Sequence, residues 1–505
     1  MPSPVHPSNR KVKVQPTVET VSELLEKDPS ANVIPFYAFI SNENLTPVTT
    51  YLKLRGAAPE GSYSFILESA IGGDKVDRFS FVGVAPRKVI VTGNGFGENV
   101  DPLTVLEAEL EPYRQLQTPS LPPMSGGAIG YVSYDCIKYF EPKTARELKD
   151  TLGIPESVLL LFDNLVAFDH VFNRIQVICN IHVDQHADLQ AAQEFARTQI
   201  QTVADTLYSD VIEYPVQPPI VPGNEYKSNV GQEGYENFVN QLKVHILKGD
   251  IFQGVPSQRI ARPTSLHPFN IYRHLRTVNP SPYMFFIENV DFQIVGASPE
   301  LLVKSENGRI ITHPIAGTVK RGKSVEEDTL LAQELQSSLK DRAEHVMLVD
   351  LARNDVTRVC DPKTTTVDRL MTVERFSHVM HLTSQVSGVL REGKTRFDAF
   401  RSIFPAGTVS GAPKVRAMEL ISELEGERRG IYAGAVGHWG YDKGTMNTCI
   451  ALRTMLVKDG VAYLQSGGGI VYDSDPYDEY LESMNKLASN IRTITEAEKI
   501  YQSQE

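Results

Sequence analysis

A long helix is expected at Ser338-Leu339-Lys340-Asp341-Arg342-Ala343-Glu344-His345-Val346-Met347-Leu348-Val349-Asp350-Leu351-Ala352-Arg353-Asn354-Asp355, which holds good helix formers and neither Gly nor Pro. At about 100° per residue, one face collects four apolar side chains, those of Met347, Leu348, Leu351 and Ala352. Glu344 falls in the middle of that face, with Asp341 beside it. Because a carboxylate facing a core is costly unless its charge is compensated, the helix predicts either a Glu–Arg ion pair or a metal ligand at Glu344.

A second group of carboxylates is expected on the last helix of the chain, which follows Ser474-Asp475-Pro476. Glu479, Glu482 and Lys486 share the face opposite its apolar side. Carboxylates spaced i,i+3 suit a hard cation such as Mg²⁺, with water at the remaining positions. The alternative is a solvated face with a Glu482–Lys486 ion pair. Combined with the position of Glu344, the pattern favours a Mg²⁺ site made by Glu344 and Glu482.

Three consecutive glycines, Gly467, Gly468 and Gly469, precede that helix at the end of an expected strand. Glycine lets a backbone approach a ligand closely and turn its N–H groups toward it, although a plain tight turn is the alternative. Residues 404–414 bring small side chains to the start of another expected helix, where free N–H groups can bind an anion. The alternative there is a structural loop with ordinary capping.

Two further polar side chains stand in apolar surroundings. Arg453 lies within the expected strand 449–456 and, if it points inward, needs a carboxylate from the protein or from a substrate. His381 lies in the apolar stretch 379–382. A core histidine bonded to a carbonyl is the commoner case, and general acid–base catalysis is the alternative. Together, these patterns suggest Mg²⁺-assisted chemistry on a small carboxylate.

Composition narrows the class of protein. The 505 residues are 41% hydrophobic and 22% charged, as in ordinary globular chains. A net charge of -12 argues against a general nucleic-acid binder and requires an anionic substrate to meet a locally basic pocket. The four cysteines have no metal-ligand spacing, which fits a reducing compartment. Because no apolar run approaches the ~18 residues of a membrane span and the N-terminus has no hydrophobic signal segment, a cytoplasmic protein is expected.

Strand-like and helical patterns alternate along the chain and predict an α+β fold. The clearest boundary is the Pro-rich segment 214–224, which cannot form a helix. We therefore divide the chain into an N-terminal region 1–213, a linker 214–224, a second region 225–493 and a C-terminal tail 494–505.

Short sequence blocks in a fixed order add a resemblance to this description. The blocks are Ile66-Leu67-Glu68-Ser69, Ser125-Gly126-Gly127, Gly249-Asp250-Ile251-Phe252-Gln253, Gly296-Ala297-Ser298-Pro299-Glu300, His313-Pro314-Ile315-Ala316-Gly317-Thr318, Asp341-Arg342-Ala343-Glu344-His345, Pro405-Ala406-Gly407-Thr408 and Gly467-Gly468-Gly469-Ile470-Val471. Over residues 33–490 the chain resembles the chorismate-utilising enzymes, specifically the large subunits of anthranilate synthases, and fungal members among them. The resemblance implies two packed antiparallel β-sheets flanked by helical layers, with a regulatory N-terminal region and a catalytic second region.

The resemblance also implies a reaction, the conversion of chorismate and ammonia to anthranilate and pyruvate with Mg²⁺. The family's metal ligands match Glu344 and Glu482, and its catalytic positions match Glu300, His381, Thr408 and Gln253. Its substrate-binding positions match Gly317, Thr318, Tyr432, Arg453, Gly467, Gly468 and Gly469. Glu300 would protonate the departing ring hydroxyl, and His381, with Thr408 near it, would act in the second step, when pyruvate leaves.

Two positions separate the sister enzymes of this family. Isochorismate and salicylate synthases carry a lysine where this chain has Gln253, and aminodeoxychorismate synthases carry one where it has Ala316. Neither Gln nor Ala offers an amine that could act as base or nucleophile. We therefore expect anthranilate synthesis, with aminodeoxychorismate synthase as the alternative. A non-catalytic tryptophan-sensing subunit is a second alternative, and the presence of the catalytic set counts against it.

Partners and regulation follow from the same resemblance. No Gly-x-Cys-x-Gly nucleophile elbow surrounds any cysteine, so a separate glutamine amidotransferase subunit would supply ammonia. The family's inhibitor, L-tryptophan, would bind at Glu68, Ser69, Pro282 and Met284. Because Glu68 lies far along the chain from Glu344, inhibition would have to shift a shared two-state body.

Overall fold

The structure, a computed structural model, describes residues 11–41, 44–69, 78–93, 95–376 and 379–502. Within these residues two large sheets dominate, and the strand pairings of both are antiparallel. Two antiparallel sheets between helices confirm the α+β fold that the resemblance implies.

The larger sheet has the strand order β1 (Val33–Ile40), β8 (Arg174–His182), β7 (Asn164–Asp169), β3 (Phe79–Val84), β2 (Ser64–Glu68), β12 (Tyr283–Glu288), β13 (Gln293–Ser298), β22 (Thr454–Lys458), β23 (Val461–Gly467), β11 (Ser257–Pro263) and β9 (Lys227–Ser228). The smaller sheet has the order β16 (Ile315–Lys320), β18 (Val379–Val389), β15 (Arg309–Thr312), β14 (Leu301–Glu306), β21 (Met446–Ile450), β20 (Ala435–Gly440), β5 (Gly127–Val132), β6 (Ser157–Phe162) and β4 (Lys88–Thr92), and β17 (Thr366–Arg375) also pairs with β18. A separate pair joins β10 (Gln253–Gly254) to β19 (Gly411–Ala412).

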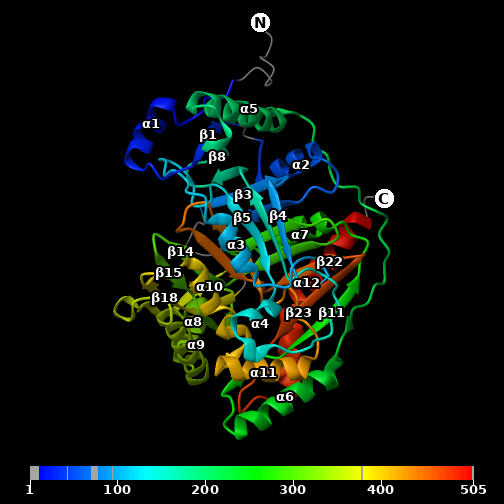
Figure 1. The fold of residues 1–505 in the computed structure, drawn as a ribbon. Coiled ribbons are helices and arrows are strands. Elements are labelled where there is room, and N and C mark those ends of the chain that lie inside the picture. Colours follow the sequence, from blue (N-terminus) through cyan, green and yellow to red (C-terminus); the bar gives the residue numbers. More distant parts are fainter. Residues whose placement is uncertain (1–10, 42–43, 70–77, 94, 377–378, 503–505) are drawn as a thin grey trace.

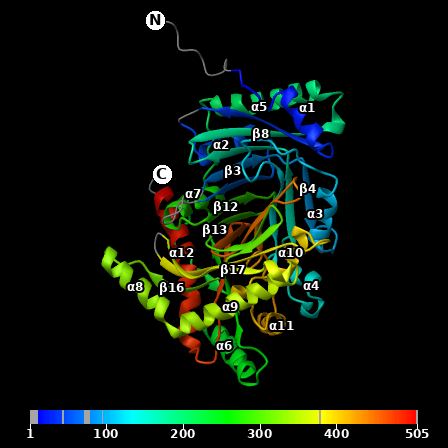
Figure 2. The ribbon, with the colours of Figure 1, turned by 90° about the vertical axis from the view of Figure 1, so that its left-hand side faces the viewer.

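Helices cover the outer faces of both sheets (Figures 1 and 2). They are α1 (Val18–Lys27), α2 (Pro47–Ala57), α3 (Pro102–Leu110), α4 (Ile137–Phe140), α5 (Leu189–Tyr208), α6 (Gly231–Leu247), α7 (Pro268–Val278), α8 (Val325–Ser337), α9 (Leu339–Thr357), α10 (Arg396–Ile403), α11 (Lys414–Glu425) and α12 (Pro476–Gln502). No helix in the described ranges is both long and apolar enough to cross a membrane.

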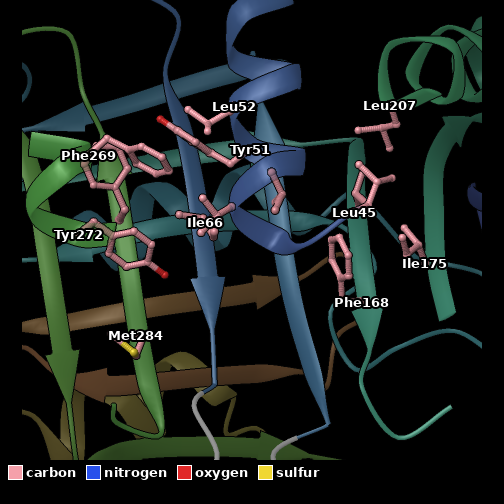
Figure 3. Packing of buried hydrophobic residues seen from close by; sticks show 14 of the residues in the cluster. Leu45, Tyr51, Leu52, Ile66, Phe168, Ile175, Leu207, Phe269, Tyr272 and Met284 are labelled. Carbon is pink, nitrogen blue, oxygen red and sulfur yellow. The ribbon is translucent and has the colours of Figure 1, made fainter. Parts of the chain in front are cut away.

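Side-chain alternation along the strands builds the layers, as strand geometry requires. On β12, Met284 and Phe286 join the cluster under the helices, whereas Phe285 and Ile287 join the cluster between the sheets. In the outer cluster, Figure 3 shows Tyr51 of α2 beside Phe269 of α7, and their rings stack at 4.4 Å between centroids. The molecule is thus a helix–sheet–sheet–helix stack.

The segment 214–224 separates two regions of sequence, but strands from both regions lie in each large sheet. In the larger sheet, β2 pairs with β12. In the smaller sheet, β5 pairs with β20. At the other end of the chain, α12 continues through Gln502, and Ile494 and Ala497 are buried in the outer core. The two regions therefore share their cores.

One expected strand is wrong in its extent. Residues 449–456 were expected to form a single strand, but β21 ends at Ile450 and β22 begins at Thr454. The two strands belong to different sheets, so the chain crosses from one sheet to the other at residues 451–453. Arg453 lies at this crossing with a φ of 50°. The periodicity of an apolar run cannot reveal such a break, because both strands are buried.

Candidate active site

Helix α9 carries Glu344, although its buried face differs in part from the expected stripe. Leu348 and Ala352 are buried as expected, but Met347 and Leu351 are only partly buried, and His345 is fully buried instead. Glu344 therefore lies at the edge of the buried face rather than in its middle. Its carboxylate Oε1 accepts a hydrogen bond of 2.9 Å from Gln253 Nε2. The side chain pairs with this amide and not with an arginine.

The surroundings of Glu344 disfavour its ionised form. Burial raises its pKa, and the neighbouring carboxylates Glu482 and Asp341 raise it further, while Gln253 and Lys486 act in the opposite direction. A bound cation would stabilise the ionised form of such a carboxylate, because it offsets both the burial and the neighbouring negative charges. The electrostatic influence of Glu482 also means that α9 and α12 bring their acidic side chains to one place.

On α12 the carboxylates differ in environment. Glu479 is buried, and its Oε1 accepts 2.6 Å from Ser474 Oγ. Glu482 forms an i,i+4 ion pair with Lys486 at 2.8 Å, the contact that the sequence offers as the alternative to a metal site on this face. Lys486 also donates to the carbonyl oxygen of Gly467 at 2.9 Å. Loss of water around Glu482 raises its pKa, but Lys486 and Lys340 more than offset this and hold the pKa below its ordinary value.

The glycine turn lies between the two acidic helices. A Cβ at Gly468 would stand 3.0 Å from Glu479 Oε2 and 3.8 Å from Glu482 Oε1. A Cβ at Gly469 would stand 2.2 Å from Gln253 Nε2 and 3.4 Å from Glu344 Oε1. A larger residue at either glycine would therefore displace these side chains, and Glu344 and Glu482 flank the same turn.

The donor set suits Mg²⁺. Glu344 and Glu482 offer hard oxygen ligands, and their mutual repulsion would be relieved by a divalent cation. Among the described residues, no group of three or more His, Cys, Asp or Glu is arranged to hold a metal. Mg²⁺ commonly takes one or two carboxylates and completes its shell with water and substrate oxygens, so two ligands are sufficient.

Glu300 is a buried acid at the start of β14, with 5% of its surface exposed. Burial raises its pKa to about 8, even though Thr408 and the N–H of Ile315 both favour the ionised form. Thr408 Oγ1 donates to Glu300 Oε1 at 3.0 Å. Near neutral pH, Glu300 therefore carries a proton that it can donate.

His381 lies on β18 opposite β16. Its Nδ1 lies 3.1 Å from the carbonyl oxygen of Gly317 and 3.0 Å from Thr318 Oγ1. Because a carbonyl can only accept, Nδ1 carries the proton and Nε2 keeps its lone pair. Burial lowers the pKa of His381 to about 4, so the ring is neutral at physiological pH. The unprotonated Nε2 of this neutral imidazole can accept a proton, and the lowered pKa makes it a weak base.

The resemblance places Thr408 near His381, but the Thr408 hydroxyl donates its hydrogen bond to Glu300. The hydroxyl that contacts His381 belongs to Thr318. β16 links the acid and the histidine, since its first residue, Ile315, donates to Glu300 and Gly317 accepts from His381.

Arg453 and Tyr432 form a polar corner beside the glycine turn. No carboxylate of the described chain lies within salt-bridge distance of Arg453, whose pKa is lowered by burial. Burial raises the pKa of Tyr432 to about 12, while Arg429 and Arg453 lower it, and the N–H of Gly467 donates to the tyrosine oxygen. Arg453 also acts electrostatically on His381. A partly buried cation without an internal counter-charge is suited to bind a ligand carboxylate.

A residue that the sequence did not single out supports the turn. Tyr235 on α6 is fully buried, and its hydroxyl accepts 3.0 Å from the N–H of Gly468. Its only sequence signal is its place on the apolar face of a helix, which is the position of an ordinary core tyrosine.

A separate cavity of about 880 Å³ lies between the two sheets, and its lining includes all four residues predicted to bind tryptophan, Glu68, Ser69, Pro282 and Met284. Ser69 Oγ donates to the carbonyl oxygen of Pro282 at 2.5 Å. Glu68 pairs with Arg276 at 2.8 Å and accepts 2.6 Å from Tyr272. The end of β2 and the start of β12 bring these residues together.

Comparisons with known proteins agree on one family. Residues 47–492 match the family described as chorismate binding enzyme. The chain is 61% identical over 497 residues to anthranilate synthase component 1 of Saccharomyces cerevisiae, covering 97% of this chain and 98% of the relative. It is 58% identical to the probable anthranilate synthase component 1 of Schizosaccharomyces pombe, covering 98% and 99%. The crystal structure of anthranilate synthase component I from Streptococcus pneumoniae superposes with a TM-score of 0.74 at 37% identity, covering 89% of this chain and 98% of that one.

Proposed function

Because the chain belongs to the chorismate binding enzymes, and within them to the anthranilate synthase component 1 proteins, we propose that it converts chorismate and ammonia to anthranilate and pyruvate. The observation that carries the proposal is the glycine turn at Gly468 and Gly469, flanked by Glu344 from α9 and Glu482 from α12. In this proposal the turn is the floor of the chorismate site. The reaction would be the first committed step of tryptophan biosynthesis.

The substrate carries two carboxylates, and the site offers a means of holding each. Glu344 and Glu482 would hold Mg²⁺, which when bound supplies a Lewis acid and template for the ring carboxylate. Arg453 would bind the enolpyruvyl carboxylate, assisted by the Tyr432 hydroxyl and by N–H groups near Gly469. Binding of the two carboxylates at these two places would use the unpaired charge of Arg453. It would also orient the ring between Glu300 and His381.

Two buried groups have the protonation states that the two steps require. Glu300, protonated near neutral pH, would donate its proton to the ring hydroxyl, which leaves as water while ammonia adds to the ring. His381, neutral and with Nε2 available, would then accept the proton from the ring carbon. Loss of that proton allows pyruvate to depart and the ring to become aromatic.

The nucleophile is proposed to be ammonia rather than water. Gln253 donates to Glu344 and has no basic nitrogen that could activate water. Ala316 on β16 likewise offers no amine that could attack the ring. A separate glutamine amidotransferase subunit would supply the ammonia, in a cytoplasmic hetero-oligomer.

Tryptophan is proposed as the feedback inhibitor, bound in the cavity lined by Glu68, Ser69, Pro282 and Met284. A physical route from this cavity to the acid exists, because β12 pairs with β13 and places Tyr283 opposite Ser298. Ser298 lies two residues before Glu300, and its hydroxyl donates to the carbonyl oxygen of Ile450 at 2.6 Å. The N–H of Ile450 in turn donates to the carbonyl oxygen of Glu300. A shift of β12 would therefore be transmitted to Glu300 through the β12–β13 hairpin.

The test is direct. Purified full-length chain is mixed with chorismate, ammonium and Mg²⁺, and anthranilate is followed by its fluorescence. Chorismate consumption without fluorescence would instead identify an aminodeoxychorismate synthase, whose product has no aromatic ring. If chorismate is not consumed and no fluorescence appears, while the chain still binds tryptophan, the chain is a non-catalytic sensing subunit.

A further inference from the structure

We infer that Arg429, a fully buried arginine just after α11, is a positioning residue that joins the segments carrying Gln253, Thr408 and Tyr432. The inference rests on the proposed function, because it assigns Arg429 a role in that reaction. Arg429 is 2% exposed and its side chain donates hydrogen bonds to residues outside the two acidic helices, so we do not include it in the proposed metal site.

The guanidinium connects two loops of the site. Its Nη1 donates to the carbonyl oxygen of Val409 at 2.9 Å, and its Nη2 donates to that of Val255 at 2.7 Å. Val409 directly follows Thr408, the hydrogen-bond partner of Glu300. Val255 lies two residues after Gln253, the partner of Glu344. The arginine thus ties together the turn that orients the acid and the strand that orients the metal carboxylate.

The counter-charge of Arg429 extends this connection to the glycine turn. Glu425 receives two hydrogen bonds from Arg429, at 2.8 Å from Nε and 2.7 Å from Nη2. The same carboxylate accepts from the backbone N and the Oγ of Ser257, at 2.7 and 2.8 Å. Ser257 is the register partner of Gly467 in the β11–β23 ladder. The pair therefore also anchors the strand beside the turn.

Two aromatic rings lie against the guanidinium. Its central carbon lies 4.5 Å from the ring centre of Tyr134 and 5.5 Å from that of Tyr432. Tyr432 is the residue proposed to bind the enolpyruvyl carboxylate together with Arg453. Cation–π contacts strengthen when they are desolvated, so Arg429 restrains the Tyr432 ring while donating elsewhere.

Arginine is required at this position by geometry. Its planar group directs donors to one carboxylate and two carbonyl oxygens at once, whereas lysine has a single point charge on a flexible stem. An Arg429→Lys chain would keep the positive charge beside Glu425 but leave at least one buried carbonyl without its donor. The charge would survive while the alignment of the loops would not.

The chain offers a matched control, since Arg262 also forms a buried bidentate pair with a carboxylate. Its Nη1 and Nη2 donate to Glu498 at 2.8 and 2.6 Å, and it is 4% exposed. Arg262 lies on β11 opposite Ala462, on the part of the strand that leads away from Ser257 and the glycine turn. Arg262→Lys therefore disturbs the same kind of ion pair without touching a loop of the site.

The experiment compares Arg429→Lys with Arg262→Lys in the full-length chain, using ammonium, Mg²⁺ and chorismate at equal folded fractions. We expect kcat of Arg429→Lys to fall by about 10²-fold, the cost of a misplaced reacting group, and kcat of Arg262→Lys to stay near that of the unchanged chain. The alkaline limb of the kcat–pH profile should move to higher pH only in Arg429→Lys. Displacement of Thr408 would weaken its hydrogen bond to Glu300, and this bond lowers the Glu300 pKa. Equal kcat values and equal pH profiles for the two variants would overturn the inference.

Two further measurements test the inference, and the first of them does not require that Arg429→Lys folds. Tyr134→Leu removes one aromatic face and no hydrogen bond, because the Tyr134 hydroxyl has no partner among the described residues. It should lower kcat several-fold in a folded chain, and an unchanged kcat would overturn the inference. If Arg429→Lys folds, its loss should be less than additive with that of Thr408→Val, and additive losses would exclude a route through Thr408. An unchanged chain that makes no anthranilate would overturn the proposed function itself, and this inference with it.

Discussion

Thr408 Oγ1 donates a hydrogen bond to Glu300 Oε1 at 3.0 Å. This bond lowers the pKa of a carboxyl group whose pKa burial alone would raise further. The pKa of Glu300 is raised to about 8 by burial, with Thr408 acting in the opposite direction. The acid is thus protonated at neutral pH but still able to release its proton. The balance between burial and one hydroxyl can be tested through pH dependence.

Thr408→Val should move the alkaline limb of the kcat profile to higher pH. Glu300 acts in its protonated form, so activity is lost as pH rises through its pKa, and removing a bond that favours the ionised form raises that pKa. A hydrogen bond to a charged group worth about 1.4 kcal/mol corresponds to about one pH unit. Thr448→Val is the control, because the buried Thr448 donates to the carbonyl oxygen of Val303 instead. A limb that stays in place, or moves to lower pH, would contradict the role of Thr408.

Glu344→Gln should abolish Mg²⁺ binding and turnover while making the metal-free protein more stable. In the folded state the pKa of Glu344 is raised, so the protein loses stability as the pH rises above the unfolded pKa of this carboxyl, and the loss is complete above the folded pKa. The neutral amide should remove this penalty, so the melting temperature of the metal-free protein should rise. Calorimetric titration with Mg²⁺ and thermal unfolding without it measure the two effects.

Glu496→Gln, on the C-terminal part of α12 where the half-buried Glu496 pairs with Arg492 and His274, provides the matched control and should leave Mg²⁺ binding unchanged. Near-normal turnover in Glu344→Gln or in Glu482→Gln would remove those residues from the metal site.

Gly469→Ala should lower kcat by about 10²-fold or more. The new methyl group would stand 2.2 Å from Gln253 Nε2, so the amide must leave its bond to Glu344. Gly444→Ala is a suitable control, because the nearest atoms to its added Cβ lie 3.8 Å away. Both variants are assayed by anthranilate fluorescence after circular dichroism has established that they fold. Comparable activity in the two variants would contradict a close-packed turn at the site.

Ser69→Arg should relieve inhibition by tryptophan without lowering kcat more than slightly. Ser69 lines the cavity between the sheets and donates to the carbonyl oxygen of Pro282, so a long charged side chain there would occupy the ligand's space. Inhibition curves and calorimetric tryptophan binding provide the measurement, and Ser30→Arg on an exposed turn is the control. An unchanged inhibition constant in Ser69→Arg would place the inhibitor elsewhere.

Local patterns in the sequence determined much of this protein. Helical periodicity placed Glu344, Glu479 and Glu482 on α9 and α12, and the glycine run marked the turn between them. These features could be predicted because a helix repeats every 3.6 residues and a close approach demands glycine, whatever the rest of the chain does.

Only the tertiary structure decided which of these residues meet. Gln253 and Glu344 are 91 residues apart, and Thr408 and Glu300 are 108 apart. Their pairing depends on how two sheets pack, and no short-range pattern encodes that packing. For the same reason the break before Arg453 and the contacts of Arg429 were not visible in the sequence: both depend on buried segments that local hydrophobicity cannot tell apart. Side-chain periodicity is a property of neighbours along the chain, whereas the partners of a buried charge are chosen by the folded core as a whole.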